Sequence, residues 1–280
     1  MSFATGERVS FNEGTSYLRC TDHSGTDMQL HLARDDNGAP EIFRSVQGEG
    51  RNCGRLRTFI RLSGCNLHCV WCDTAYTWNW KGTGFAHERD TEKLLHKFEL
   101  TTEVVRLSVD EICSLVRKAP SEGVVITGGE PLMQRVALVA LIDALQRDST
   151  PLQIEIETNG SIAPPDELAE RVDLFMVSPK LGHSGNDPSV ALKPEVLRRF
   201  AELESASFKF VARTRGDIET VAQLTNTFGI AAGRIYIMPE GTDAVALTTR
   251  SRDLVSTIID HGFNYSPRLH IDLFGDTRGT

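Results

Sequence analysis

The sequence predicts one α/β domain built on a parallel sheet, either an open doubly wound sheet or a partial barrel. About seven strand-like runs alternate with helical stretches between residues 57 and 274, which is typical of repeated βα units. Polar and glycine residues follow most of these runs. Because ligands of parallel α/β proteins bind beyond the carboxyl ends of the strands, we expect a binding site at that edge.

Composition narrows the class of protein. Hydrophobic residues make up 40% and charged residues 24% of the 280 residues, as in a soluble globular protein with a sizeable core. The formal net charge of -8 argues against a sequence-independent nucleic-acid surface. There is no apolar run of about 18 residues and no secretion leader, so we expect a cytoplasmic protein that binds neither nucleic acid nor membrane. Three of the six cysteines fall in one motif, which does not indicate a disulfide framework.

The first elements are short. Residues 1–40 are polar and irregular, and we interpret them as an N-terminal extension before a single domain over residues 41–280. A turn signal at residues 35–38 is compatible with a short hairpin in the extension. Residues 41–50 form a short apolar run that ends in a glycine-containing loop. Arg57 to Leu62 alternates basic with apolar or hydroxyl residues, which predicts a strand buried on one face.

Strands and helices alternate in the rest of the chain. A polar segment at residues 86–100 has a helix-like pattern, and we interpret it as a surface insertion. Ser108-Val109-Asp110-Glu111 is a capping box, and it opens a helix that Pro120 ends. Further strands are expected at residues 124–127, 153–157, 174–177, 208–211, 235–238 and 269–274, and further helices at 132–147, 166–171, 195–204, 217–227 and 250–261.

Three cysteines, Cys65, Cys69 and Cys72, lie in a C-x3-C-x2-C stretch just after the strand at 57–62. A loop this short can present three thiolates to three irons of a cubane cluster. Iron–sulfur clusters are usually held by four cysteines, so one iron would remain open to a cofactor or substrate. The alternative is a structural zinc site completed by Cys53 or His68.

A glycine turn, Gly128-Gly129-Glu130-Pro131, follows the strand at 124–127. Its two glycines allow a ligand to approach the backbone closely, and its carboxylate can accept hydrogen bonds from an ammonium group. The alternative is a tight strand-to-helix turn with Pro131 at the start of the helix.

Together, the cysteine spacing and the glycine turn resemble the radical S-adenosylmethionine (SAM) superfamily. Further motifs resemble the 7-carboxy-7-deazaguanine synthase family, and the resemblance extends over residues 41–280. These motifs are Gln47-Gly48-Glu49-Gly50, Arg61-Leu62-Ser63-Gly64-Cys65-Asn66, Cys72-Asp73-Thr74, Thr127-Gly128-Gly129-Glu130-Pro131, Glu157-Thr158-Asn159-Gly160, Ser178-Pro179-Lys180 and the tail with Leu269-His270 and Arg278-Gly279.

The resemblance implies a modified, incomplete (β/α) barrel that forms a homodimer. It implies a carbon–nitrogen lyase of queuosine-type deazapurine biosynthesis, which converts 6-carboxy-5,6,7,8-tetrahydropterin to 7-carboxy-7-deazaguanine with loss of ammonia. A reduced [4Fe-4S] cluster would cleave SAM to a 5′-deoxyadenosyl radical, and that radical would abstract hydrogen from C6 of the pterin before ring contraction. The electron would come from a donor such as flavodoxin or ferredoxin.

Residue roles follow from the same resemblance. The cluster ligands would be Cys65, Cys69 and Cys72, and the hydroxyl of Thr74, otherwise a helix N-cap, would bind Mg2+. SAM would contact Trp71, Cys72, Asp73, Gly129, Glu130, Asn159, Ser178, Pro179 and Lys180. The pterin would contact Val46, Gln47, Gly48, Arg61, Thr127, His270 and the terminal Thr280, with Arg61 pairing with its carboxylate. Glu49 would accept from the pterin amino group or transfer a proton.

Two features leave alternatives open. The family commonly has Gln at the position of Arg268, so this arginine could alter a substrate contact. The cysteine loop and glycine turn also fit other radical SAM enzymes, such as a glycyl-radical activating enzyme. A non-catalytic iron–sulfur or zinc protein is the alternative outside enzymes.

Overall fold

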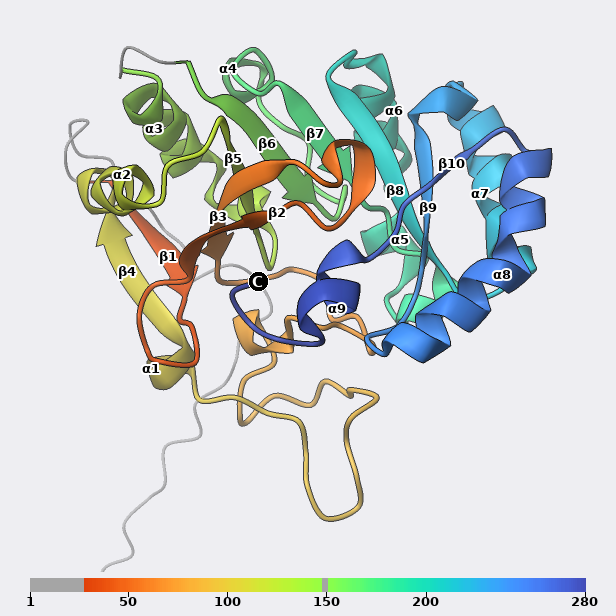
Figure 1. The fold of residues 1–280 in the computed structure, drawn as a ribbon, viewed down its shortest axis with the longest axis horizontal. Helices are drawn as coiled ribbons and strands as arrows, with labels where there is room; N and C mark the ends of the chain where they lie inside the picture. Colours follow the sequence, from red (N-terminus) through yellow and green to blue (C-terminus); the bar gives the residue numbers. More distant parts are fainter. Residues whose placement is uncertain (1–27, 148–150) are drawn as a thin grey trace, which may run out of the picture.

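The computed structural model describes residues 28–147 and 151–280. These residues form a ten-stranded sheet in the order β10-β9-β8-β7-β6-β5-β3-β1-β4, with β2 paired to β3 (Figure 1). The strands are β1 (Gln29–Ala33), β2 (Ile42–Val46), β3 (Leu56–Leu62), β4 (Val104–Ser108), β5 (Gly123–Gly128), β6 (Gln153–Thr158), β7 (Leu174–Val177), β8 (Ala206–Ala212), β9 (Ile235–Pro239) and β10 (Asn264–Tyr265).

The sheet is mostly parallel and open. Neighbours from β3 through β10 along this path pair in parallel, whereas β1 and β2 pair antiparallel with β3, and β4 pairs antiparallel with β1. The path starts at β10 and ends at β4 without closing. The predicted α/β fold with an incomplete barrel is therefore confirmed.

Helices cover one face of the sheet. Figure 1 shows α2, α3, α6 and α7 on the outer side, whereas α9 and the C-terminal end lie on the other side. The capping box predicted at Ser108 is present at the start of α2. The helices are α1 (Leu100–Glu103), α2 (Val109–Lys118), α3 (Arg135–Leu145), α4 (Asp166–Ala169), α5 (Pro188–Ala191), α6 (Pro194–Glu202), α7 (Arg215–Phe228), α8 (Ala244–Asp260) and α9 (Leu269–Phe274). Among the described residues, no helix is long and apolar enough to cross a membrane.

Side-chain alternation along the strands separates a core from a site. Successive strand residues point to opposite faces, and Ile60, Ile126, Ile156 and Phe208 belong to one apolar core with residues of the outer helices. The residue that follows each of them in the sequence is polar and lies on the opposite face of the sheet. These neighbours are Arg61, Thr127, Glu157 and Lys209.

The strand predicted at residues 269–274 is wrong, whereas the surface insertion predicted at residues 86–100 is confirmed without its helix-like pattern. Residues 269–274 form the helix α9 and not a strand, because Ile271 is buried whereas Leu273 and Phe274 are exposed, so only one side of a helical turn packs. Residues 86–100 contain no helix before α1, and they project from the body of the protein (Figure 1). Asp90 accepts backbone N–H bonds from both His87 and His96, and such side-chain bonds compete with helix formation.

The predicted extension is also shorter than residues 1–40. Within it, Gln29–Ala33 form β1 inside the sheet, where Leu30 and Leu32 are fully buried. The two apolar side chains at alternate positions explain this placement, because they lie on the core face between β3 and β4. Residues 1–27 of the extension lie outside the described residues.

Candidate active site

A cavity of about 440 Å³ lies at the carboxyl ends of the strands, as the sequence predicts. Most of the predicted site residues line it together, although they come from segments far apart in the sequence. The predicted residues that line the cavity are Val46, Gln47, Gly48, Glu49, Arg61, Cys65, Cys69, Trp71, Cys72, Asp73, Thr74, Thr127, Gly129, Asn159, Ser178, Lys180, His270 and Thr280. Two predicted SAM contacts, Glu130 and Pro179, are not among its lining residues.

The cysteine loop is fastened to the ends of β3 and β5. Glu130 N donates to Gly64 O over 2.8 Å. A Cβ at Gly129 would lie only 2.1 Å from Gly64 O, so this close approach requires glycine. Burial raises the pKa of the Cys69 thiol to about 11, and binding of iron would therefore displace a proton from it.

The donor set fits an iron–sulfur cluster. Cys65, Cys69 and Cys72 line one cavity, and cysteine thiolates are the usual ligands of such clusters. Among residues 28–147 and 151–280, no three His, Cys, Asp or Glu side chains are grouped closely enough to hold a single metal ion.

Glu130 has a structural position and does not reach the cavity. It is fully buried, and its carboxylate accepts from Leu132 N at 2.9 Å, Thr158 Oγ1 at 2.8 Å and Asn159 N at 2.6 Å. Burial raises its pKa to about 7 despite these donors. The carboxylate thus ties the end of β5 to the end of β6, and its predicted contact with SAM stays a prediction.

Other predicted SAM residues do lie together. Lys180 Nζ donates to Ser178 Oγ at 2.9 Å and lies 5.8 Å from the ring centroid of Trp71. Asn159 Nδ2 donates to Asn66 Oδ1 at 3.0 Å, next to the first cysteine. A cation, a hydroxyl, an aromatic ring and an amide therefore border the cysteine loop on one side.

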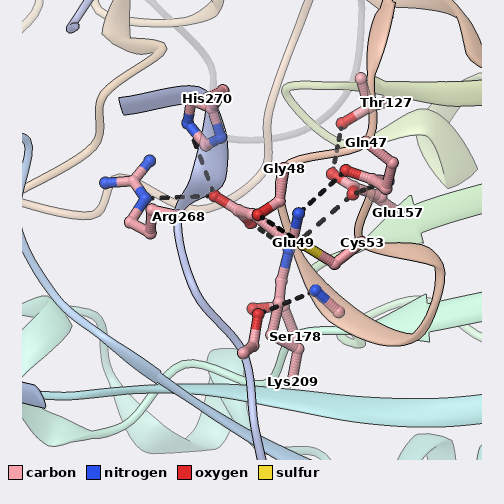
Figure 2. Close-up of polar contacts among 12 residues, drawn as sticks. Gln47, Gly48, Glu49, Cys53, Thr127, Glu157, Ser178, Lys209, Arg268 and His270 are labelled. Atoms are coloured by element: carbon pink, nitrogen blue, oxygen red, sulfur yellow. Dashed lines mark hydrogen bonds and ion pairs between the residues drawn. The ribbon is translucent and has the colours of Figure 1, made fainter. Parts of the chain in front are cut away.

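A group of charged residues also lines the cavity, and Figure 2 shows their contacts. Glu49 forms an ion pair with Lys209, and Lys209 Nζ lies 3.8 Å from Glu157 Oε1. Thr127 Oγ1 donates to Glu157 Oε2 at 3.0 Å. Burial by itself raises the pKa of Glu49, but Lys209 and Arg268 outweigh burial and hold that pKa far below its usual range. Glu49 is therefore ionised near neutral pH.

Gln47 forms hydrogen bonds with three glutamate residues in and next to this charged group. Its Nε2 donates to Glu155 Oε1 at 3.2 Å and Glu157 Oε1 at 3.1 Å, and its Oε1 accepts from Glu49 N at 3.2 Å. Gln47 is almost fully buried. Burial, with the nearby charge of Glu157, raises the pKa of Glu155 to about 7. The amide of Gln47 is thus engaged with protein groups, and its predicted contact with the pterin stays a prediction.

Arg268 links Glu49 to the cysteine loop. Its Nε donates to Glu49 Oε1 at 3.1 Å, and its Nη2 donates to Asp73, which directly follows the third cysteine. His270 Nε2 lies 3.8 Å from the same Glu49 oxygen (Figure 2). A Cβ at Gly48 would lie 2.1 Å from His270 Nδ1, so the loop before Glu49 can pack against α9 only with glycine there.

Arg61 lines the cavity, and part of its guanidinium is already bonded to a protein carboxylate. Its Nε donates to Glu41 Oε1 at 2.7 Å, and Tyr76 OH also donates to Glu41. The Glu41 side chain is completely buried, so Arg61 neutralises a charge that would otherwise be costly. Its position on β3 agrees with the prediction, but it has a structural partner that sequence reasoning missed.

Sequence reasoning also missed Lys209 and Glu157 as site residues. Both lie beside core residues on mostly buried strands: Lys209 between Phe208 and Phe210 on β8, and Glu157 directly after Ile156 on β6. A charged residue inside a buried run marks the inner face of a strand, and this signal could have found them.

Comparisons with known proteins agree with this site. A family described as "4Fe-4S single cluster domain" matches residues 46–193. The chain is 34% identical over 241 residues to a 7-carboxy-7-deazaguanine synthase from Pyrobaculum aerophilum, covering 85% of this chain and 95% of the relative. It is 36% identical to the enzyme of that name from Hyperthermus butylicus, covering 82% and 90%.

A solved structure shares the fold. The crystal structure of QueE from Escherichia coli matches with a TM-score of 0.61 at 25% identity, covering 86% of this chain and 95% of the other. The three-cysteine loop, the cavity and these relatives lead to one conclusion. The chain belongs to the 7-carboxy-7-deazaguanine synthase family of radical SAM enzymes.

Proposed function

We propose that this chain converts 6-carboxy-5,6,7,8-tetrahydropterin to 7-carboxy-7-deazaguanine with loss of ammonia. The observation that carries the proposal is one cavity lined both by the three cysteines and by a group of charged residues. The names of the relatives support the same reaction. In this arrangement a cluster and its cofactor would face a polar, carboxylate-bearing substrate across the cavity.

The cysteine side would hold the cofactors. Cys65, Cys69 and Cys72 would bind the [4Fe-4S] cluster. Lys180 can pair with the carboxylate of SAM, and Gly129 offers its backbone to the same half of the molecule. When bound, the cluster and SAM supply the hydrogen-abstracting radical chemistry. The protein residues hold these groups in place and keep water away from them.

The charged side would hold the pterin. Arg61 would bind the substrate carboxylate, because a guanidinium matches a carboxylate with two parallel donors. Glu49, kept ionised by Lys209 and Arg268, would accept a hydrogen bond or a proton from an amino group of the pterin. Glu157 supplies a second carboxylate in the same group of charged residues.

The predicted Mg2+ site has a limited donor set. Thr74 Oγ1 lines the cavity, but the neighbouring Asp73 is paired with Arg268. Mg2+ keeps several waters and binds substrate oxygens readily, so Thr74 fits it as a single protein ligand. A homodimer and reduction by flavodoxin or ferredoxin remain predictions.

The test is anaerobic reconstitution followed by incubation with the carboxytetrahydropterin, SAM and a chemical reductant. We expect 7-carboxy-7-deazaguanine as the product, and we expect Cys69→Ala to abolish both the cluster and turnover. SAM cleavage without this product would instead indicate a different radical SAM reaction, such as activation of a glycyl-radical enzyme.

The substrate role of Arg61 needs a conservative variant. Arg61→Ala would also leave Glu41 without its cation, so a loss of activity could come from unfolding. Arg61→Lys keeps the charge and loses the planar fork. We expect KM for the pterin to rise about 10- to 100-fold, with the cluster retained. Arg44→Lys, at an exposed position on the neighbouring strand β2, is the matched control, and an unchanged KM in Arg61→Lys would contradict the assignment.

A further inference from the structure

Two side chains outside the predicted site donate hydrogen bonds to the proposed cluster ligands. Asn186 Nδ2 lies 3.3 Å from Cys69 Sγ, and Trp78 Nε1 lies 3.3 Å from Cys72 Sγ. Asn186 lies in the turn before α5, and Trp78 follows the cysteine loop. Each side chain thus places an N–H group against the sulfur of a different cysteine.

The orientation of the Asn186 amide is fixed by its other contacts. Its Oδ1 accepts from His68 N, inside the cysteine loop, at 2.8 Å. A backbone N–H can only donate, so the oxygen of the amide faces His68 and the NH2 group faces the sulfur. The turn that carries Asn186 is itself fastened to the loop, because Val70 N donates to Ser184 O at 3.0 Å.

The direction of the Trp78 contact is equally clear. An indole nitrogen is a donor only, so the contact to Cys72 is an N–H to sulfur hydrogen bond. Trp78 is 3% exposed, and its ring has edge contacts with His68 and Phe85. The indole is therefore held in a dry environment, where a hydrogen bond to a charged sulfur is strong.

These hydrogen-bond donors affect the reduction potential of the cluster. One-electron reduction adds a negative charge to the cluster and its thiolates, with no bond made or broken. An N–H dipole aimed at a sulfur stabilises the more negative, reduced form more than the oxidised one. Hydrogen bonds to the sulfurs are among the factors that set the potentials of iron–sulfur clusters.

We propose that Asn186 and Trp78 raise the reduction potential of the cluster, through N–H bonds to Cys69 and Cys72, and so make it easier to reduce by an external one-electron donor. The proposal rests on the ligation proposed above. It assigns both residues a tuning role, because each donates a hydrogen bond to the sulfur of a cysteine.

The first test is Trp78→Phe, which removes the N–H and keeps an aromatic ring. The midpoint potential of the reconstituted protein is measured without SAM, by EPR of the reduced cluster at a series of dithionite-poised potentials. We expect the ratio of reduced to oxidised cluster at a fixed potential to fall about tenfold, a shift of about 59 mV to more negative values for a one-electron couple. Trp80→Phe is the matched control, because among the described residues the indole that donates to a cysteine sulfur is that of Trp78.

The second test is Asn186→Asp, which keeps an acceptor oxygen for His68 N and replaces the donor to Cys69. We expect a negative shift at least as large as in Trp78→Phe, since a carboxylate oxygen near the sulfur opposes reduction. Iron and sulfide content is measured for every variant. A full cluster with the wild-type potential in both variants would overturn the proposal and leave the ligation intact, whereas a full cluster in Cys69→Ala would overturn the ligation itself.

Discussion

Replacing Glu130 decides between a contact to the cofactor and a brace between strands. In Glu130→Ala, two buried backbone N–H groups, those of Leu132 and Asn159, lose their acceptor, as does the hydroxyl of Thr158. The hydroxyl can turn to another partner, but the backbone groups cannot. At about 1–3 kcal/mol for each unsatisfied donor, the loss in unfolding free energy is about 2–6 kcal/mol. That is a large part of the stability of a typical domain.

The loss of unfolding free energy in Glu130→Ala should depend on pH. Burial raises the pKa of Glu130 from 4.5 to about 7, so ionising it costs the folded protein about 3 kcal/mol more than the unfolded chain. The stabilisation by Glu130 is therefore complete below pH 4.5 and falls as the pH rises through 7. Urea unfolding followed by circular dichroism at pH 6 and pH 8 should show the larger difference between wild type and Glu130→Ala at pH 6.

The same variant series tests the cofactor role. Glu130→Gln keeps the shape and one acceptor oxygen, and we expect it to bind SAM within about twofold of the wild type. Glu122→Ala, at an exposed position before β5, is the matched control and should change stability by less than about 0.5 kcal/mol. Wild-type stability combined with lost SAM binding in Glu130→Gln would refute the reasoning and place the carboxylate on the cofactor.

Three further predictions concern residues that line the cavity or support its wall. Gly129→Ala would place a Cβ 2.1 Å from Gly64 O; we expect a loss of about 1–3 kcal/mol and reduced iron content, and full iron content would contradict the close contact. Arg268→Met removes a cation that lowers the pKa of Glu49, so the acid limb of the kcat/KM profile should move to higher pH. An acid limb at the wild-type pH would show that ionisation of Glu49 does not control kcat/KM. Glu155→Gln cannot ionise; because burial raises the pKa of Glu155 to about 7, the wild type loses up to about 3 kcal/mol between pH 4.5 and pH 8, and urea unfolding should show that much less pH dependence in the variant.

The sequence was informative where one physical signal dominates. Continuous apolar runs located β5, β7 and β9, and the capping box at Ser108 located the start of α2, because burial and capping act locally. The cysteine spacing indicated a site at this loop because the three cysteines lie within eight residues of one another. The pattern at residues 269–274 misled because six residues with alternating character fit a strand and a single helical turn alike.

Long-range pairing explains what the sequence could not supply. The partner of Arg61 is Glu41, and two of the three partners of Glu130, Thr158 and Asn159, are at the end of β6; neither of these long-range pairings leaves a local pattern. Gln47 donates to Glu155 and Glu157 on the distant strand β6, and no pattern in the sequence indicated these partners. Such contacts follow from the sheet order, which joins β3 to β5 and β6 without a signal in the chain itself.

The turn that carries Asn186 has a consequence for biogenesis. Asn186 lies 117 residues after Cys69 in the chain, so the cysteines leave the ribosome well before their brace is synthesised. Until residues 184–186 have emerged and β7 has joined the sheet, the loop lacks the groups that hold its sulfurs apart. We therefore expect iron delivery to follow the synthesis of residues 184–186, and a ribosome-bound fragment ending before this turn should take up little iron.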